Sequence, residues 1–277
     1  LDDAYLTLIQ QYGFQEETLE LQFDYADFLS YFKQEPELAI AHLEKYLTFV
    51  SAELERARIQ MKIADILVYS NQFNQALILY TKIQTEHKNS VISQEARFKV
   101  AQTSYFKGDF LWAQNQLKVL KSSTSQLIAN DALELNLKIS TNFDKDSSNL
   151  ALLDFAQAEL LSFQKKNTEA IAIFENILLQ YKGQKIEDDT LFKMGQINSA
   201  EGDFITAEMR FLTLLDLHPD SIWADDAIFN LAEIYHYQLN DVVRAREMYE
   251  KIIFEFPSSI HLVASRKGFR LIRGDEL

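Results

Sequence analysis

One small residue recurs along this chain at a nearly constant interval. The recurring alanines are Ala39, Ala76, Ala113, Ala170, Ala207 and Ala245, separated by 37 or 38 residues except for one interval of 57. Self-similarity at a period of this size is the signature of repeat architectures, in which each unit buries its apolar face by stacking on its neighbours. We therefore expect the chain to fold as a stack of similar units.

The clearest copies of the unit lie between residues 188 and 257. In the first copy, Leu191, Met194 and Asn198 are three and four residues apart, so they share one helical face. Gly195 is a small residue where a second helix must approach closely. Gly202 then ends the helix, because glycine adopts a positive φ at little cost. These residues predict a first helix followed by a turn.

A second helix completes this copy. Its apolar stripe is Ala207, Phe211 and Leu214, and it ends before Pro219, which has no amide hydrogen to donate. The next copy repeats the ladder with Ile228, Leu231, Ala232, Tyr235, Ala245, Tyr249, Ile252 and Pro257. The inner turn of that copy, around residues 238–241, is one residue longer than the turn around 200–203, because Tyr235 and Ala245 are ten positions apart whereas Asn198 and Ala207 are nine apart.

These two copies resemble the tetratricopeptide repeat, a helical hairpin of about 34 residues. In that family a large residue, a Leu-Gly pair and a Tyr mark the first helix, while Ala, Phe and Ala mark the second. Here Leu191 and Ile228 replace the usual Trp, Asn198 replaces the Tyr in one copy, and Tyr235 keeps it in the next. The resemblance implies an all-α, right-handed α-solenoid of stacked hairpins with one inserted helix and a C-terminal capping helix.

The C-terminal half is also similar to tetratricopeptide proteins of Bacteroidetes-type bacteria. The phrases that carry this similarity are residues 218–227 and 256–267. In that subtype, the repeats help to assemble periplasmic or outer-membrane complexes. The resemblance therefore favours the periplasm or cell envelope over the cytoplasm.

The long alanine interval exceeds the others by the length of one helix and a turn. It predicts an extra helix over residues 125–141, with Leu133, Leu137 and Ile139 facing inward, and a flexible loop over 142–149 that is rich in Asn, Asp and Ser. We expect an N-terminal array over 1–124, the inserted helix and loop over 125–149, and a C-terminal array with its capping helix over 150–277. Together they would form one continuous solenoid.

Composition excludes several classes of function. The net charge of −14 disfavours binding to nucleic acid or to anionic membranes, because phosphates would be repelled on average. With no cysteine, the chain has no disulfide, thiolate metal site or cysteine nucleophile. No stretch of about 18 apolar residues is present to span a membrane. The first residue is Leu1 and no signal peptide is recognisable, so we interpret the chain as an excised segment or a mature form.

No pattern of catalytic residues emerges. The five histidines have no metal-ligand spacing, and neither a nucleophile elbow nor a glycine-rich phosphate loop is present. The carboxylate pairs Asp188-Asp189 and Asp225-Asp226 fall in first turns of predicted helices, where the helix dipole favours acids. We therefore predict a non-enzymatic protein without cofactor or metal. In the last helix, Arg266, Arg270 and Arg273 share one face, which suits either the C-terminal dipole or an acidic partner.

In tetratricopeptide arrays the first helices line a concave groove that holds the partner. Alignment with the family implies these groove residues here: Met61, Asp65, Tyr69, Phe98, Gln102, Tyr105, Phe106, Phe192, Gln196, Phe229, Glu233, His236 and Tyr237. Glu95, Asp189 and Asp226 occupy further groove positions. This mixture of aromatic, acidic and amide side chains suits a peptide or helix with apolar anchors and basic residues. Lys62, Lys99 and Lys193 lack the Asn partners of the family's carboxylate clamp, so we predict no chaperone cofactor.

Two other classes of function remain open. The chain could be a structural self-assembly module that forms a homodimer through an exposed end of the array. It could also belong to an enzyme whose catalytic domain lies outside this segment. Our prediction is an adaptor that binds a protein or peptide.

Overall fold

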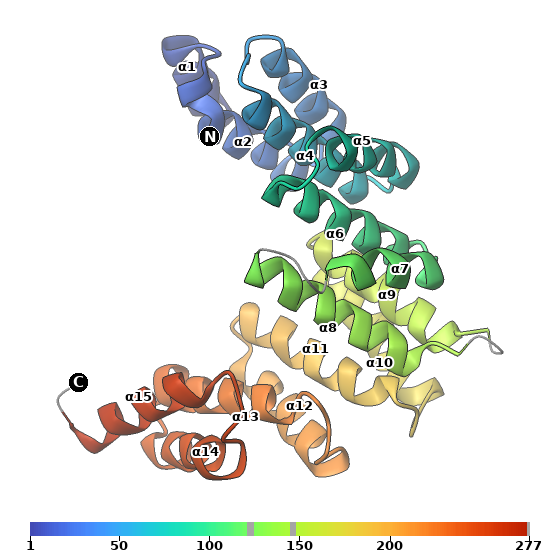
Figure 1. Ribbon diagram of the computed structural model, residues 1–277. Coiled ribbons are helices and arrows are strands. Elements are labelled where there is room, and N and C mark those ends of the chain that lie inside the picture. The colour runs from blue at the N-terminus through green and yellow to red at the C-terminus, as the bar shows by residue number, and fades with distance from the viewer. Residues whose placement is uncertain (121–124, 145–147, 276–277) are drawn as a thin grey trace. The chain divides into compact units, whose positions relative to one another are not determined.

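The computed structural model describes residues 1–120, 125–144 and 148–275, which are helical and contain no β-strand (Figure 1). Over these residues the chain forms 15 α-helices, one short 3-10 helix and two π-helical turns. Consecutive helices pack against each other in antiparallel pairs. The predicted all-α class and the solenoid of stacked hairpins are therefore confirmed.

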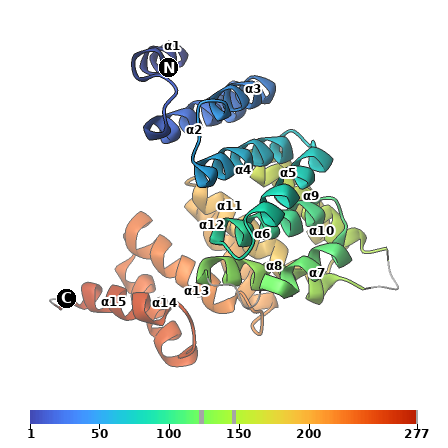
Figure 2. The same cartoon turned by 45° about the horizontal axis from the view of Figure 1, so that its top comes forward.

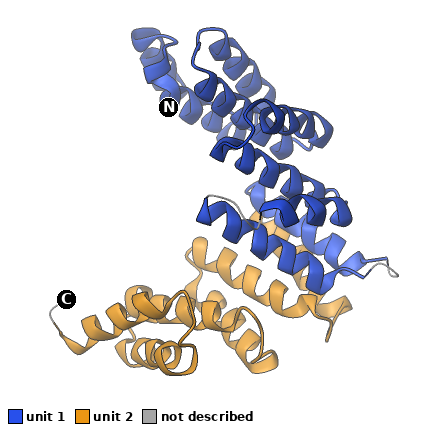
Figure 3. Cartoon of the chain, in the orientation of Figure 1, with its two compact units in different colours: residues 1–166 blue, residues 167–277 orange. Residues whose placement is uncertain are grey.

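The chain divides into two compact units, Leu1–Lys166 and Asn167–Leu277 (Figure 3). Unit 1 contains α1 (Asp2–Tyr12), α2 (Leu19–Asp27), α3 (Pro36–Leu47), α4 (Glu53–Tyr69), α5 (Phe73–Glu86), α6 (Val91–Phe106), α7 (Phe110–Leu120), α8 (Gln126–Asn142) and α9 (Leu150–Phe163). Unit 2 contains α10 (Asn167–Gln180), α11 (Ile186–Ala200), α12 (Phe204–Leu217), α13 (Ala224–Glu233), α14 (Val242–Glu255) and α15 (Leu262–Arg273).

Each hairpin turn contains one residue in the left-handed region of φ. These residues are Gln34, Asn71, Gly108, Lys165, Gly202 and Asn240. Each precedes one of the recurring alanines by five positions, and all six alanines are 0% exposed. A side chain larger than a methyl group would not fit at these positions without moving the facing helix. The repeat interval read from the sequence is therefore confirmed.

Two hairpins carry the longer turn, and in both the extra residue is absorbed by a π-helical turn. These turns are η2 (Phe28–Phe32) at the end of α2 and η3 (Ile234–Gln238) at the end of α13. In each, an amide bonds a carbonyl five residues back, from Lys33 to Phe28 and from Leu239 to Ile234, both at 3.0 Å. The π-turn thus keeps the second helix in register despite the insertion.

Close approach between helices explains two glycines. A Cβ atom on Gly195 would lie 2.5 Å from the ring of Phe211, and one on Gly268 would lie 2.5 Å from the ring of Tyr249. Both rings are fully buried. The predicted contact at Gly195 is confirmed, and Gly268 brings the capping helix α15 against α14 in a similar way. This helix begins at Leu262.

The inserted helix is present as α8. It packs against α7 as α4 packs against α3 and as α6 packs against α5, so it occupies the place of a first helix (Figure 2). The prediction that Leu133 and Leu137 face inward is wrong, because both are exposed, whereas Ile139 is buried as predicted. The helix is rotated so that Lys138 faces inward, where α9 supplies its counter-charge. Residues 145–147 of the predicted loop lie outside the described residues.

Candidate partner-binding surface

The predicted groove residues of unit 1 lie on α4 and α6 and differ widely in exposure. Met61 is 6% exposed and Tyr105 only 1%, so both pack inside the hairpins. The remaining residues, Asp65, Tyr69, Phe98, Gln102 and Phe106, are half-buried. This face of the first helices therefore offers few free side chains.

Ion pairs between consecutive first helices occupy the charged groups of this face. The Lys62 ammonium lies 2.6 Å from the Asp27 carboxylate, and the Lys99 ammonium lies 3.1 Å from the Asp65 carboxylate. The Tyr80 hydroxyl also donates a hydrogen bond to Asp65 at 2.6 Å, and burial raises the pKa of Tyr80 well above its usual value. Lys62 and Lys99, which stand at the clamp positions, are thus already paired within the chain.

Sequence reasoning missed the contribution of α2 to this face. The ring of Tyr31 meets the ring of Tyr69 edge-on, with centroids 4.8 Å apart. Burial raises the pKa of Tyr31 above its usual value. The turn of this first hairpin is one residue longer than most, so its residues do not align with the shorter copies of the repeat. The hairpin before Ala245 has the same long turn, and alignment with that copy could have identified Tyr31 as a residue of this face.

Helix α9 covers the part of this face that α6 contributes. The Tyr105 hydroxyl donates to the Glu159 carboxylate at 2.8 Å, and the rings of Phe106 and Phe163 lie 6.0 Å apart. At the end of α9, the Gln164 amide donates to the carbonyl of Tyr69 at 2.9 Å. From the sequence, α9 is predicted only as the first helix of a further hairpin. Its pattern of residues does not indicate which neighbouring helix it packs on.

In unit 2, an Asp and a Phe one helical turn apart on each first helix are covered by a ring from the next repeat. Phe192, 5% exposed, stacks under Trp223 with centroids 4.7 Å apart, and the Trp223 indole N–H donates to Asp189 at 2.9 Å. Phe229 stacks with His261 at 4.2 Å. These side chains join successive repeats.

His261, which stacks on Phe229, also forms a hydrogen bond with a carboxylate of α13. A ring nitrogen of His261 lies 2.8 Å from the Asp226 carboxylate. The same pairing of a carboxylate with a ring donor therefore occurs at both junctions of unit 2. Asp226, a predicted groove position, is engaged inside the chain.

Four of the predicted residues of unit 2, Phe229, Glu233, His236 and Tyr237, follow one another at helical spacing on α13 and η3. The Glu233 carboxylate accepts a hydrogen bond from the Tyr249 hydroxyl at 2.5 Å, and His236 stacks on Tyr237 at 4.1 Å. Tyr237 is 53% exposed and Phe229 is half-buried. Gln196 of α11 is exposed. We call Gln196, Phe229, Glu233, His236 and Tyr237 the unit-2 surface.

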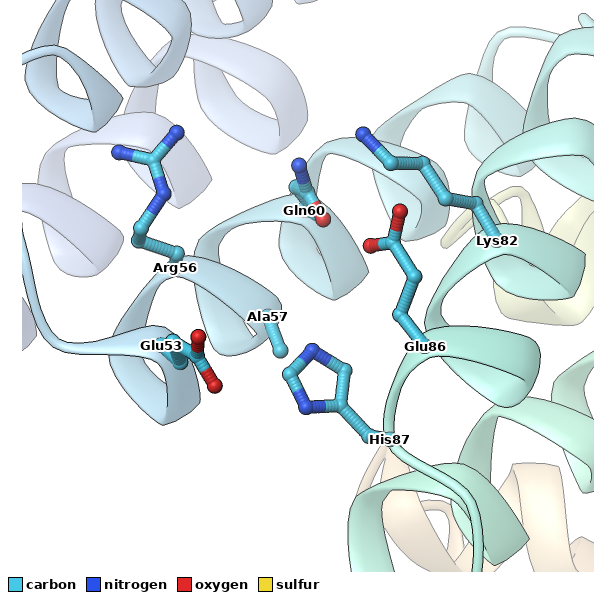
Figure 4. A pocket seen from close by; sticks show the side chains of 7 residues that line it. All are labelled: Glu53, Arg56, Ala57, Gln60, Lys82, Glu86 and His87. Atoms are coloured by element: carbon cyan, nitrogen blue, oxygen red, sulfur yellow. The ribbon is translucent and has the colours of Figure 1, made fainter.

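A cavity of about 330 Å³ lies between the start of α4 and the end of α5 (Figure 4). It is lined by Glu53, Arg56, Ala57, Gln60, Lys82, Glu86 and His87. Arg56 donates to the carbonyls of Leu47 and Val50, so it is already bonded. Because the lining mixes both signs of charge, it selects no class of ligand. Over the described part of the chain, no cluster of three or more His, Asp or Glu side chains has the geometry of a metal site.

No helix of the described residues is long and apolar enough to cross a bilayer. The family model described as tetratricopeptide repeat matches residues 226–259, which span α13 and α14. No curated protein matches the chain. The chain therefore carries a tetratricopeptide repeat at 226–259, and its paired helices form a solenoid of that kind.

Several solved structures are similar in fold. The apo form of RapI is 15% identical with a TM-score of 0.38, and the match covers 99% of this chain and 80% of that chain. The C-terminal part of a TPR repeat-containing protein from Cytophaga hutchinsonii is 14% identical with a TM-score of 0.37, covering 95% and 92%. The TPR domain of P58(IPK) is 14% identical with a TM-score of 0.37, covering 94% of this chain and 65% of that domain.

Proposed function

We propose that this protein is a non-enzymatic adaptor that binds a segment of another protein on the unit-2 surface. The observation that carries the proposal is the exposed ring of Tyr237, held by its stack on His236 beside Phe229 and Glu233. Exposed aromatic rings that are already fixed in place lose little entropy on binding, and they dominate the energy of many interfaces. The matched repeat at 226–259 contains all four of these residues.

The chemistry of the surface indicates the class of partner. The exposed ring of Tyr237 offers an anchor for an apolar side chain, while Gln196 and Glu233 can bond polar or basic groups. The net charge of −14 steers a basic segment toward the protein and repels an acidic one. A peptide or helix with apolar and basic residues fits this surface best. As part of the same proposal, we infer from the resemblance of residues 218–227 and 256–267 that the adaptor works in a bacterial cell envelope.

The predicted groove residues of unit 1 are less accessible than Tyr237, which favours a binding surface on unit 2. Tyr105 is buried and bonded to Glu159 of α9, while Tyr69 and Phe106 are half-buried and contacted by residues at the end of that helix, so these side chains are less accessible than Tyr237. Tyr237, by contrast, is 53% exposed.

Capture of partners from a lysate of cells that produce the protein tests this function. We expect Tyr237→Ala to lose most of a bound protein, because loss of an aromatic anchor costs about 2 kcal/mol or more. Leu179→Ala is the control, since Leu179 is 80% exposed on α10, which is a second helix rather than a first. Equal loss in both variants, or retention in Tyr237→Ala with its helicity intact, would place binding elsewhere.

The alternative function, self-assembly, is favoured by one observation. Ile205, Met209 and Leu212 are 66%, 51% and 43% exposed and follow one face of α12 at helical spacing. An apolar stripe of this kind can pair with a second copy of itself.

A further inference from the structure

A second cavity in unit 1 has a lining of one charge sign. Its volume is about 490 Å³, within the range of small-molecule sites. The end of α5, the start of α6 and the end of α7 enclose it. The lining residues are Gln84, Thr85, Lys88, Asn89, Ser93, Gln94, Arg97, Val119 and Leu120, and we call this cavity the basic pocket.

The lining of the basic pocket is positively charged, whereas the chain as a whole is negatively charged. The protein has 41 acidic and 27 basic side chains, yet this lining contains Lys88 and Arg97 and no carboxylate. The neighbouring cavity at the other side of α5 includes Glu53 and Glu86. A net positive lining favours an anionic ligand even in an acidic protein.

Arg97 lacks the bonding partner that each of the other cations of α4 and α6 has. Arg58 pairs with Glu20 and Glu55, Lys62 with Asp27, and Lys99 with Asp65. Arg56 is bonded to two carbonyls. Within the described residues, Arg97 and Lys88 make no hydrogen bond or ion pair.

The position of Arg97 has no other electrostatic explanation. Lys88 follows the C-terminus of α5, whose carbonyls attract a cation, so it identifies no ligand by itself. Arg97 stands beyond the first turn of α6, where the effect of the helix terminus has faded. Its side chain is half-buried, so it has lost part of its hydration without gaining a partner. A bound anion would supply that partner.

The other lining residues indicate which chemical group is attached to the anionic group of the ligand. Ser93 donates its hydroxyl hydrogen to the carbonyl of Gln84 at 3.0 Å. The Asn89 amide is a neutral donor at the rim. Val119, 56% exposed, and Leu120 form an apolar wall on the α7 side. We propose that the basic pocket binds an oxyanion, a carboxylate or a phosphoryl group, attached to a small apolar body.

Calorimetric titration of the whole chain at low salt tests this site with two probes, N-acetyl-leucine and inorganic phosphate. We expect saturable one-site binding of at least one probe, weakened about tenfold or more in Arg97→Gln, since a bond to a charged group contributes about 1.5–3 kcal/mol. Lys118→Gln, which removes the same charge from an exposed site of α7 outside the lining, should bind within about twofold of the wild type.

The same titrations distinguish a ligand with a carboxylate from a ligand with a phosphoryl group. Tighter binding of N-acetyl-leucine than of its uncharged amide and of phosphate indicates a peptide carboxyl terminus or a small organic acid. Tighter binding of phosphate indicates a phosphoryl ligand. Equal affinity of Arg97→Gln and wild type, or no saturable binding of either probe, overturns the proposal. Because Arg97 lies in unit 1 and bonds no described residue, this test is independent of the unit-2 surface.

Discussion

At the scale of single residues, the interior of the chain is bonded through side chains that the repeat pattern does not specify. Tyr80, Tyr105, Tyr235 and Tyr249 are buried, and each donates its hydroxyl hydrogen to an Asp or Glu. A buried hydroxyl without an acceptor would be costly, and in these four tyrosines a carboxylate supplies the acceptor. Acidic residues of both first and second helices, such as Glu233 on α13 and Glu208 on α12, thus have a structural role as well as a surface one.

One residue gives the stability of unit 1 a pH dependence. Burial, with a smaller contribution from Lys45, lowers the pKa of His42 from 6.5 to about 4, while a ring nitrogen lies 2.8 Å from the side-chain oxygen of Gln22. The unfolded chain then binds a proton at His42 that the folded chain does not, between pH 6.5 and about 4. We expect unit 1 to lose stability as the pH falls through this window. Urea unfolding at pH 7 and pH 5 measures it, and His42→Gln should show a smaller difference.

At the scale of helices, the inserted helix α8 determines where α9, the last helix of unit 1, packs. The Lys138 ammonium lies 2.7 Å from the Glu159 carboxylate, and their side chains are 8% and 11% exposed. The same ammonium lies 5.3 Å from the centre of the Phe155 ring. This buried ion pair joins α8 to α9 and holds α9 over the first-helix face of α6.

Breaking this pair tests how firmly α9 is held. Glu159→Ala leaves Lys138 buried without its partner carboxylate, which costs about 3–5 kcal/mol of unfolding free energy. Urea denaturation followed by circular dichroism measures the loss. Glu175→Ala is the control, because the Glu175–Arg210 pair is half exposed at its carboxylate and should contribute little. If both variants lose the same small amount, the pair does not anchor α9.

At the scale of the whole molecule, two compact units with separate cores carry different surfaces. Unit 1 is closed over α6 by its own helix and holds the basic pocket. Unit 2 keeps the exposed rings of α13 and η3. A solenoid of this kind depends on contacts between neighbouring repeats, so each unit presents its surfaces independently.

The mass of the whole chain in solution separates the adaptor from the self-assembly module. As an adaptor, the protein should have a mass of 32.1 kDa by light scattering at every concentration tested. A mass that rises with concentration and returns to this value in Met209→Glu would favour self-assembly through α12. Tyr237→Ala should leave the mass unchanged in either case.

The sequence by itself determined the repeat. The six alanines, the left-handed turn residues before them and the glycine at 195 are local requirements, because each one is set by the close approach of two helices that are neighbours in sequence. Such contacts recur at every hairpin, so their spacing can be read without coordinates. The class of fold and the place of the inserted helix followed from this spacing.

Only the tertiary structure decided which surface is open. Tyr105 and Phe192 stand at groove positions of the repeat, yet Glu159 of α9 bonds the first and Trp223 covers the second. The rotation of α8 depends in the same way on a carboxylate that lies 21 residues away. A repeat pattern records the contacts that all copies share. The contacts that differ, made between residues far apart in the chain, arise when the helices pack, and these select Tyr237 and Arg97 as the residues to test.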